Sequence, residues 1–298
     1  MIEYMEQIKT NRLARELAQL RTQRKMYAID LFRAYKAACA PFTDVMPEPL
    51  DFHSFGPIKE ILDQPSDINV DSESFLHLMP ELDGVVEEWR RIILKKFIKE
   101  VKVGVVKRSD ILDDNPLDLD TPNESILQRI QLASTVFACI PCTNHQGFDT
   151  MRDLLRSPHS VPFYLPTKSR SPHTRPLWFP RVLGHRCLTK PRGRDLSDAA
   201  TNLSVLICHR QRWSCDSVIT VDQEACEAAV AIIKACEMDP RTATVDDMDQ
   251  LDARLECLKC LVPNAEENFH IAFGWRSAVR ATFIGRFQSM NLALRADR

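Results

Sequence analysis

Glycine is scarce in this chain, with only eight glycines among its 298 residues. Folds that bind nucleotides through glycine-rich phosphate loops need several glycines at fixed spacing, and neither a G-x-G-x-x-G pattern nor a Walker loop occurs here. The zinc-peptidase pattern H-E-x-x-H and the serine-hydrolase pattern G-x-S-x-G are also missing. Because no nucleophile or acid–base constellation stands out, we expect a protein that is not an enzyme.

The chain also lacks the signals that direct a protein into a membrane or out of the cell. Its first residues are polar and include Glu3 and Glu6, unlike a secretory signal peptide, and no apolar run approaches a bilayer span of about 20 residues. The formal net charge of −2 gives no overall attraction to nucleic acid or to membranes. Ten cysteines in such a chain predict reduced thiols or metal ligands, and hence a cytoplasmic or nuclear location.

The pattern of apolar residues predicts a mainly α-helical protein in three parts. Residues 1–40 are expected to form a long amphipathic, coiled-coil-like helix, and residues 41–122 a helical region with linkers. Residues 123–298 are expected to form a zinc-binding helical domain with short strands and one or two zinc sites. This last part carries a proline- and arginine-rich insertion at about 143–178. The acidic run Asp110–Asp120 predicts a solvated loop at the domain boundary.

The first helix carries a heptad-like seam, in which apolar residues recur at alternating steps of four and three residues. Two interpretations are open. The helix can form a coiled coil with a partner or a second copy, or it can fold back on its own domain as an amphipathic helix. The seam consists of Leu13, Leu17, Leu20, Arg24, Tyr27, Leu31, Ala34 and Ala38, and Arg24 is its one charged interruption.

Local signals predict shorter elements in the two later parts. Thr244 and Asp247 have the spacing of a capping box at the start of a helix. The apolar residues after Glu81 keep helical spacing for about five turns, to Ile98. Further helices are expected at about 57–62, 72–80, 124–132, 203–213, 222–236, 244–254 and 275–287, and short strands at 135–139 and 255–257.

Cysteines and histidines supply the main candidate chemistry. Cys139 and Cys142 form a first C-x-x-C pair, and Cys257 and Cys260 form a second. This spacing suits zinc because a short turn lets both sulfurs reach one tetrahedral centre. Buried structural thiols are the alternative interpretation, since free cysteine is among the most buried residue types.

Two arrangements of the zinc ligands are open. Both cysteine pairs can close one site across a long loop, or each pair can begin a site of its own. In the second arrangement the first pair takes His185 and Cys187, which are separated by one residue. The second pair then needs partners such as His270 or Cys236.

Residues 154–194 are the one stretch that predicts binding of a polyanion. They contain seven prolines and no Asp or Glu, and basic residues alternate with aromatic ones. Arginine beside aromatic rings can contact phosphates and stack on bases, whereas a solvated insertion is the simpler alternative. The candidate contacts are Lys168, Arg170, Arg175, Arg181, Arg186, Lys190, Arg192 and Arg194.

Several phrases of the chain carry a family resemblance. They are PLDF at 49–52, VEEWR at 86–90, TVFACIPC at 135–142, FPRVLGHRCLT at 179–189, MDPRTATVDDMDQLDAR at 238–254, CLKC at 257–260 and GWRSAV at 274–279. Together they resemble a group of uncharacterised proteins from mushroom-forming fungi, described as F-box-type proteins with a zinc-binding C-terminal part. An F-box itself is not recognisable in this chain, so a role as a ubiquitin-ligase receptor is an analogy.

The resemblance implies two small zinc sites. The first consists of the first cysteine pair with His185 and Cys187. The second starts at the second cysteine pair and ends on histidines in the last helix, where this sequence has Arg280 and Phe287 instead.

These observations predict a non-enzymatic, zinc-stabilised protein-interaction protein that serves as an adaptor or a substrate-recognition part. Structural zinc is the expected cofactor and another protein the expected partner, with a homodimer through the first helix as a further option and no role for a membrane. The alternative function is binding of nucleic acid through residues 154–194 and the adjacent zinc site.

Overall fold

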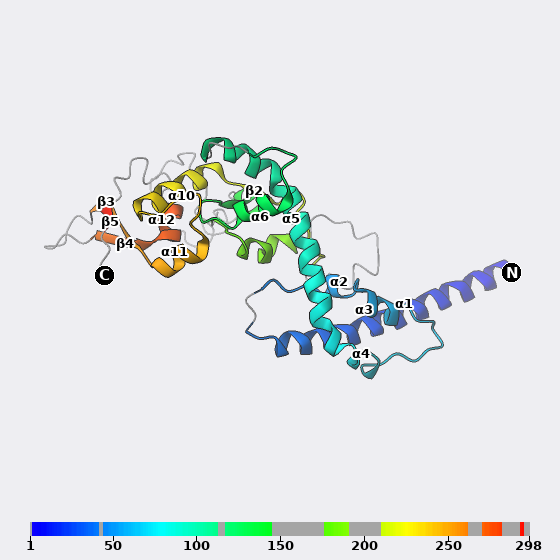
Figure 1. The fold of residues 1–298 in the computed structure, drawn as a ribbon. Helices are drawn as coiled ribbons and strands as arrows, with labels where there is room; N and C mark the ends of the chain where they lie inside the picture. The colour runs from blue at the N-terminus through cyan, green and yellow to red at the C-terminus, as the bar shows by residue number, and fades with distance from the viewer. Residues whose placement is uncertain are drawn as a thin grey trace, which may run out of the picture. The chain divides into compact units, whose positions relative to one another are not determined.

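The computed structural model describes residues 2–41, 44–112, 117–144, 176–190, 210–261, 270–281 and 293–294 (Figure 1). The chain divides into two compact units, Met1–Leu94 with Gly184–Ser214 and Lys95–Leu183 with Cys215–Arg298. Helices dominate and the strands are short, which confirms the mainly α prediction. The predicted borders near residues 40 and 122 stay a prediction.

The first unit consists mainly of helices from the N-terminal part of the chain. The long helix α1 ends two residues before the predicted end at residue 40, and the predicted helix at 57–62 is present. The elements are α1 (Ile2–Ala38), α2 (Pro49–Phe52), α3 (Gly56–Leu62), α4 (Glu73–Leu76), the 3-10 turn η1 (Met79–Glu81), the start of α5 (Leu82–Leu112) and the 3-10 turn η4 (Arg186–Leu188).

Helix α1 changes character along its length. Residues 4–19 are exposed on all sides, whereas the second half packs on α2, α3 and α4. In Figure 1 the N-terminal turns extend beyond these short helices. The structure therefore favours packing on the chain's own unit for the second half only and leaves the first half without a covering element in the described part of the chain.

The buried stripe of α1 differs from the predicted seam at its end. Leu31 and Tyr35 are buried, but Ala34 and Ala38 are exposed, so the seam prediction is wrong for these two alanines. A straight α-helix has 3.6 residues per turn and drifts by about 20° per heptad from a 3.5-residue repeat. A stripe that starts at Arg24 and Ala28 therefore reaches Tyr35 instead of Ala34.

Arg24 is buried in the first unit, where the sequence suggested only an interruption of the seam. Its guanidinium donates to the carbonyl oxygens of Pro65 (2.8 Å) and Ile68 (2.7 Å), with a longer contact to that of Leu62 (3.4 Å) and a further bond to that of Gln64. The side chain is 1% exposed. Because a loop has few backbone partners of its own, one guanidinium here fixes the path of the chain after α3.

We expect Arg24→Met to lower the free energy of unfolding by about 3 kcal/mol, because four backbone carbonyl oxygens lose the buried donor that anchors this loop. Arg21→Met is the matched control: Arg21 is exposed on the same helix, and its replacement should change stability by less than about 0.5 kcal/mol. Urea unfolding followed by circular dichroism measures both. Equal stability of the two variants would contradict the assigned role of Arg24.

The second unit combines the rest of α5 with short strands and helices. Its elements are α6 (Asn123–Ile130), β1 (Phe137–Cys139), α7 (Ile140–Asn144), the 3-10 turn η3 (Arg181–Gly184, whose last residue is grouped with the first unit), β2 (Ile219–Val221), α10 (Gln223–Ala235), α11 (Val245–Leu251), β3 (Arg254–Leu261), β4 (His270–Gly274), α12 (Trp275–Ala281) and β5 (Ala293–Leu294).

Two small antiparallel sheets organise this unit. Strand β1 pairs with β2, and a second sheet has the order β4-β3-β5. Helix α5 approaches β2 so closely that a Cβ at Gly104 would lie 2.9 Å from a methyl carbon of Val221. Phe97 of α5 also stacks edge-on against Phe137 of β1 at 5.3 Å between ring centroids. These contacts fix the strand that carries the first cysteine ligand.

The core of the second unit lies around α10. Ala225, Ala229, Ile232 and Ile233 are buried, and they pack with residues of α11 and α12. Asp222 caps this helix by accepting a hydrogen bond from the backbone of Ala225. The predicted capping box of Thr244 and Asp247 is present at α11.

Some local predictions differ from the structure. Residues 210–213, predicted as helix, have no regular secondary structure, and the rest of that prediction lies outside the described residues. Helix α5 continues to Leu112 and includes the start of the predicted acidic loop. The last helix is described only to Ala281, so its predicted extension to residue 287 lies outside the description. None of the described helices has the length and apolar character needed to cross a bilayer.

Candidate metal centre

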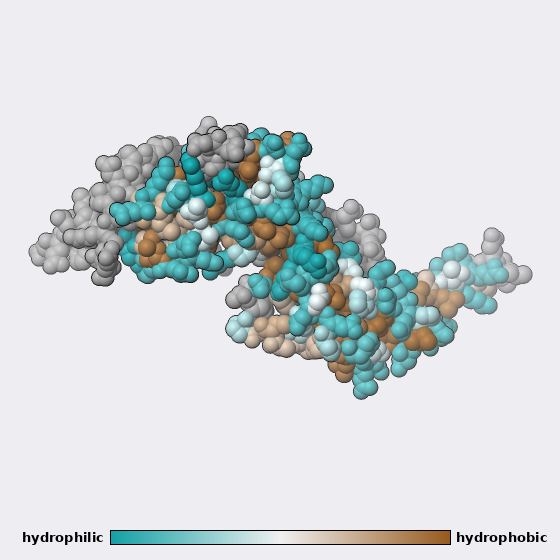
Figure 2. All heavy atoms as spheres, viewed as in Figure 1, coloured by the Kyte–Doolittle hydropathy of each residue, from teal (hydrophilic) through white to brown (hydrophobic). Residues whose placement is uncertain are grey.

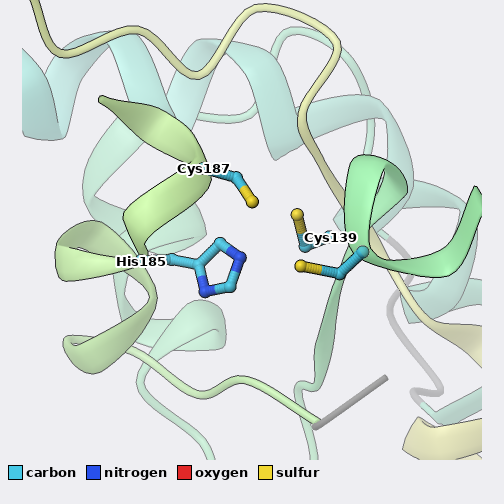
Figure 3. A group of neighbouring side chains, drawn as sticks. Cys139, His185 and Cys187 are labelled. Carbon is cyan, nitrogen blue, oxygen red and sulfur yellow. The ribbon is translucent and has the colours of Figure 1, made fainter. Parts of the chain in front are cut away.

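Four predicted ligands from two distant stretches of the sequence come together. One ligand atom from each of Cys139, Cys142, His185 and Cys187 lies within 4.8 Å of the others. In Figure 3 the labelled side chains of Cys139, His185 and Cys187 point toward one another. Cys139 and Cys187 are buried, and the other two are half-buried. The cluster can therefore hold a metal ion.

The first two ligands are positioned by the end of β1 and the turn that follows it. Cys139 pairs with Ile219 of β2, and the next residue donates from its backbone to the carbonyl of Val218 (2.8 Å). Helix α7 begins there, and Thr143 donates its hydroxyl to the carbonyl of Cys139 (2.8 Å). Because the chain changes from strand to helix between them, Cys142 folds back toward Cys139.

The other two ligands are positioned by a pair of 3-10 turns. His185 has an extended backbone between η3 and η4, with φ −66° and ψ 128°. Its carbonyl accepts a hydrogen bond from the backbone of Leu188 (2.9 Å), which closes the turn that contains Cys187. Val182 and Leu188 are fully buried on either side. The apolar neighbours anchor the turns and leave the imidazole and thiol for the cluster.

The electrostatic surroundings suit His185 as a metal ligand. Its pKa is lowered, first because burial disfavours the charged imidazolium and second because Arg186 is nearby. A metal binds the neutral imidazole, so an environment that keeps His185 neutral favours coordination. Cysteine sulfur and imidazole nitrogen are ligands that transition metals such as zinc prefer over oxygen donors.

The second cysteine pair is described only at the level of the backbone. Cys257 and Cys260 lie on β3 and His270 begins β4, but their side chains lie outside the described residues. At the level of the backbone, Leu261 pairs with His270. Cys236 is the C-cap of α10 and half-buried, and burial raises the pKa of its thiol. The second site, in either arrangement, stays a prediction.

Two other cysteines are core thiols. Cys215 and Cys226 are buried, and desolvation raises the pKa of each to about 11. At Cys226 the nearby Arg108 acts in the opposite direction but does not outweigh the burial. Cys226 also accepts a hydrogen bond from the backbone of Val136 at 3.2 Å. These thiols therefore stay protonated at neutral pH.

The predicted basic contacts are only partly described. Arg181, Arg186 and Lys190 are exposed. The remaining five candidates, Lys168, Arg170, Arg175, Arg192 and Arg194, lie outside the described residues.

Comparison with known proteins adds no relative. No family model, no curated protein and no solved structure matches the chain. The resemblance to F-box-associated proteins of mushroom-forming fungi therefore stays a prediction, and the metal cluster is the observation on which a function can be based.

We expect Cys142→Ser to remove one bound metal ion per chain, because three donors hold an ion far more weakly than four. Cys39→Ser is the matched control, since Cys39 is also half-buried but lies on a different element, immediately after α1. Plasma mass spectrometry of purified protein gives the metal content. Equal metal content in both variants and the unaltered chain would contradict the assigned ligand set.

Native protein at pH 8 should react slowly with N-ethylmaleimide at Cys215 and Cys226. With a pKa of about 11, only about one thiol in a thousand is a reactive thiolate at this pH, and burial blocks access as well. Peptide mass spectrometry over time, compared with urea-unfolded protein, measures the rate at each site. Rapid labelling of either cysteine in the folded protein would show that the site is open.

Proposed function

We propose that this chain is a non-enzymatic protein-interaction protein whose fold is held by one structural zinc ion. The ligands are Cys139, Cys142, His185 and Cys187. The observation that carries the proposal is the convergence of their four donor atoms within 4.8 Å. An adaptor or substrate-recognition role follows from the family resemblance alone and is part of the same proposal.

The donor set favours zinc over other metals. Three thiolates and one imidazole are a common ligand set of structural zinc sites, with Zn–S distances of about 2.3 Å. A tetrahedron of that size has sulfur–sulfur edges of about 3.8 Å, so the observed cluster needs only a small contraction. Magnesium and calcium take oxygen ligands, and most iron–sulfur clusters take four cysteines.

The number of protein ligands favours a structural ion. Catalytic zinc has three protein ligands and keeps its fourth position for water or substrate, whereas four protein ligands fill the tetrahedron. His185-Arg-Cys187 also lacks the His-x-Glu pattern of zinc deaminases, which supply a general acid–base in that way. An ion bound by both segments closes residues 143–184 into a loop and stabilises the folded chain by the free energy of binding.

The exposed half of α1 supports the interaction part of the proposal. Leu13 and Leu17 are 65% and 39% exposed, and Tyr4, Met5 and Ile8 are exposed as well. Figure 2 shows hydrophobic residues on the surface along this part of the chain. The two leucines continue the stripe that is buried from Arg24 onward, so a face that packs inside the unit extends beyond it. An isolated helical segment of this length is marginal in water without a partner.

A second copy of the chain is our proposed partner for this segment. The short helices α2, α3 and α4 cover the stripe from Arg24 onward. The α1 helices of two copies can therefore pair only through residues that precede Arg24. In a parallel pair, the short helices α2, α3 and α4 of both copies would have to occupy the same end of the paired helices. An antiparallel pair lets Leu13 of one copy face Leu17 of the other and keeps the two bodies at opposite ends.

Removing the metal should destabilise the folded chain. We expect dialysis against a strong chelator to lower the melting temperature by about 10 °C, equivalent to about 3 kcal/mol, and added zinc to restore it. Differential scanning fluorimetry of the unaltered chain and Cys142→Ser provides the comparison, because the variant should no longer respond to the chelator. A chelator response in the variant equal to that of the unaltered chain would place the stabilising ion elsewhere.

The exchange of Leu13→Asp together with Leu17→Asp should convert a dimer into a monomer. Charge on the stripe opposes burial of that face in a pair of helices. Ala14→Asp with Ala18→Asp is the matched control, because both alanines are exposed on another face of the same turns. Light scattering during size-exclusion chromatography gives the mass of each. A monomeric unaltered chain at micromolar concentration would contradict self-association without bearing on the zinc proposal.

A further inference from the structure

We propose that the first unit binds the phosphate backbone of nucleic acid through a basic face beside the metal ligands. We define the basic face as the side chains of six cationic residues from three stretches of the chain. The residues are Lys25, Lys36, Arg186, Lys190, Arg210 and Arg212.

Backbone hydrogen bonds hold two of these stretches together. The backbone of Gln211 donates to the carbonyl of Thr189 (2.8 Å), and that of Ser214 donates to the carbonyl of Leu188 (2.9 Å). The guanidinium of Arg210 donates to the hydroxyl of Thr189 (3.1 Å) and contacts the carbonyl of Arg186 (3.4 Å). Residues 186–190 and 210–214 therefore form one braced surface.

Buried polar groups connect this surface to α2 and α1. Both carboxylate oxygens of Asp51 accept from the backbone of Trp213, at 3.2 and 3.1 Å. The ring of His53 donates from Nε2 to the carbonyl of Lys25 (3.2 Å). These contacts bring Lys25 of α1 and Trp213, the neighbour of Arg212, against the same short segment, residues 51–53.

Electrostatic effects agree with this placement. The pKa of His53 is lowered to about 4, first by burial and then by the positive charges of Lys25 and Arg212. Lys36 and Arg210 both act to lower the pKa of Glu48, against a larger effect of burial that raises it. At each of these two side chains, one lysine of α1 and one arginine of residues 210–212 lower the same pKa. The two stretches of cations therefore act on the same groups.

Two carboxylates in the described part of the chain interact with cations of the basic face. Glu48 is half-buried, and Asp51 is buried with its oxygens bonded to backbone donors. Lys25 and Lys36 are eleven residues apart on α1, which is about 16 Å along the helix axis. That length matches about five phosphates along one strand of a duplex, at 3.4 Å per phosphate.

The character of the face favours nucleic acid over an acidic protein. Protein interfaces have an apolar core that is rich in aromatic side chains, whereas interfaces with nucleic acid are polar and strongly positive. None of the exposed large hydrophobic residues in the described part of the chain lies in residues 184–190 or 210–214. Two of the cations are also pre-positioned, Arg210 by its hydrogen bonds and Lys36 over the ring of Phe32 at 5.1 Å.

The sequence continues the positive charge on either side. Residues 154–194 have no acidic side chain, and Arg192 and Arg194 follow directly on Lys190. The inference goes beyond the proposed function because it requires neither the self-association of α1 nor a bound metal for its charge. It adds Lys25, Lys36, Arg210 and Arg212 to the contacts that the sequence indicates.

The test is fluorescence anisotropy of the full chain with a labelled 20-base-pair DNA duplex and a 20-nucleotide single-stranded RNA, between 50 and 200 mM KCl. The face variant carries Lys25→Gln, Lys190→Gln and Arg212→Gln, three positions that are not metal ligands. The control variant carries Lys59→Gln, Arg91→Gln and Lys99→Gln, which are exposed and lie outside the basic face. Both variants lose the same net charge, so any difference in affinity between them reflects the positions of the replaced residues.

We expect the unaltered chain to bind at 50 mM salt, with affinity that falls steeply as salt rises. The face variant should bind at least tenfold more weakly, with the log–log salt slope for the duplex reduced by about 3, since each phosphate contact contributes about 0.9. The control variant should stay within twofold. Melting curves of both variants show whether they fold, and the control's metal content shows whether zinc is retained.

Three results would overturn the proposal: no binding by the unaltered chain at 50 mM salt, equal binding by the face variant and the unaltered chain, or equal losses in both variants. A polyglutamate probe of equal charge extends the test. Displacement of the duplex by polyglutamate at matched charge concentration would overturn the assignment to nucleic acid and favour an acidic protein.

Discussion

The convergence of three thiols and one imidazole is the constraint on which this account of the protein depends. The donors belong to two short turns that are separated by more than forty residues, and their ligand atoms lie within 4.8 Å of one another. A metal ion coordinated by all four ligand atoms would stabilise this arrangement by its binding free energy. Such an ion would make each turn depend on the other, because neither turn alone supplies a complete coordination sphere.

The surroundings of the cluster are built to hold these turns. Cys139 ends a strand that is paired with β2, and Phe97 packs against the same strand from α5. On the other side, the segment after Cys187 is tied by backbone hydrogen bonds to residues 210–214, which Asp51 in turn holds. The ligands are thus placed by ordinary strand pairing and packing, and a bound metal would add a link between stretches that are remote in sequence.

Sequence reasoning was most successful where structure depends on neighbouring residues. The bounds of α1, the cap at Thr244 and the C-x-x-C and H-x-C turns follow from local spacing, and the structure contains them. The joining of Cys139 with His185 was one of two open arrangements, because spacing alone does not decide which distant turns meet. The structure brings the first pair to His185 and Cys187, and the side chains of the second pair lie outside the described residues.

Features that depend on distant partners were not predictable in this way. From the sequence, Arg24 only interrupts a seam, because its carbonyl partners lie about forty residues later in the chain. The three-residue strand β2 is too short for an alternating pattern, and its partner β1 is remote. Arg210 and Arg212 gain a common surface with Arg186 only through the pairing of residues 188–189 with 211–214. X-ray absorption at the zinc edge tests the central claim most directly: this account predicts about three sulfur neighbours near 2.3 Å and one nitrogen near 2.0 Å, whereas a shell of oxygen and nitrogen alone would contradict it.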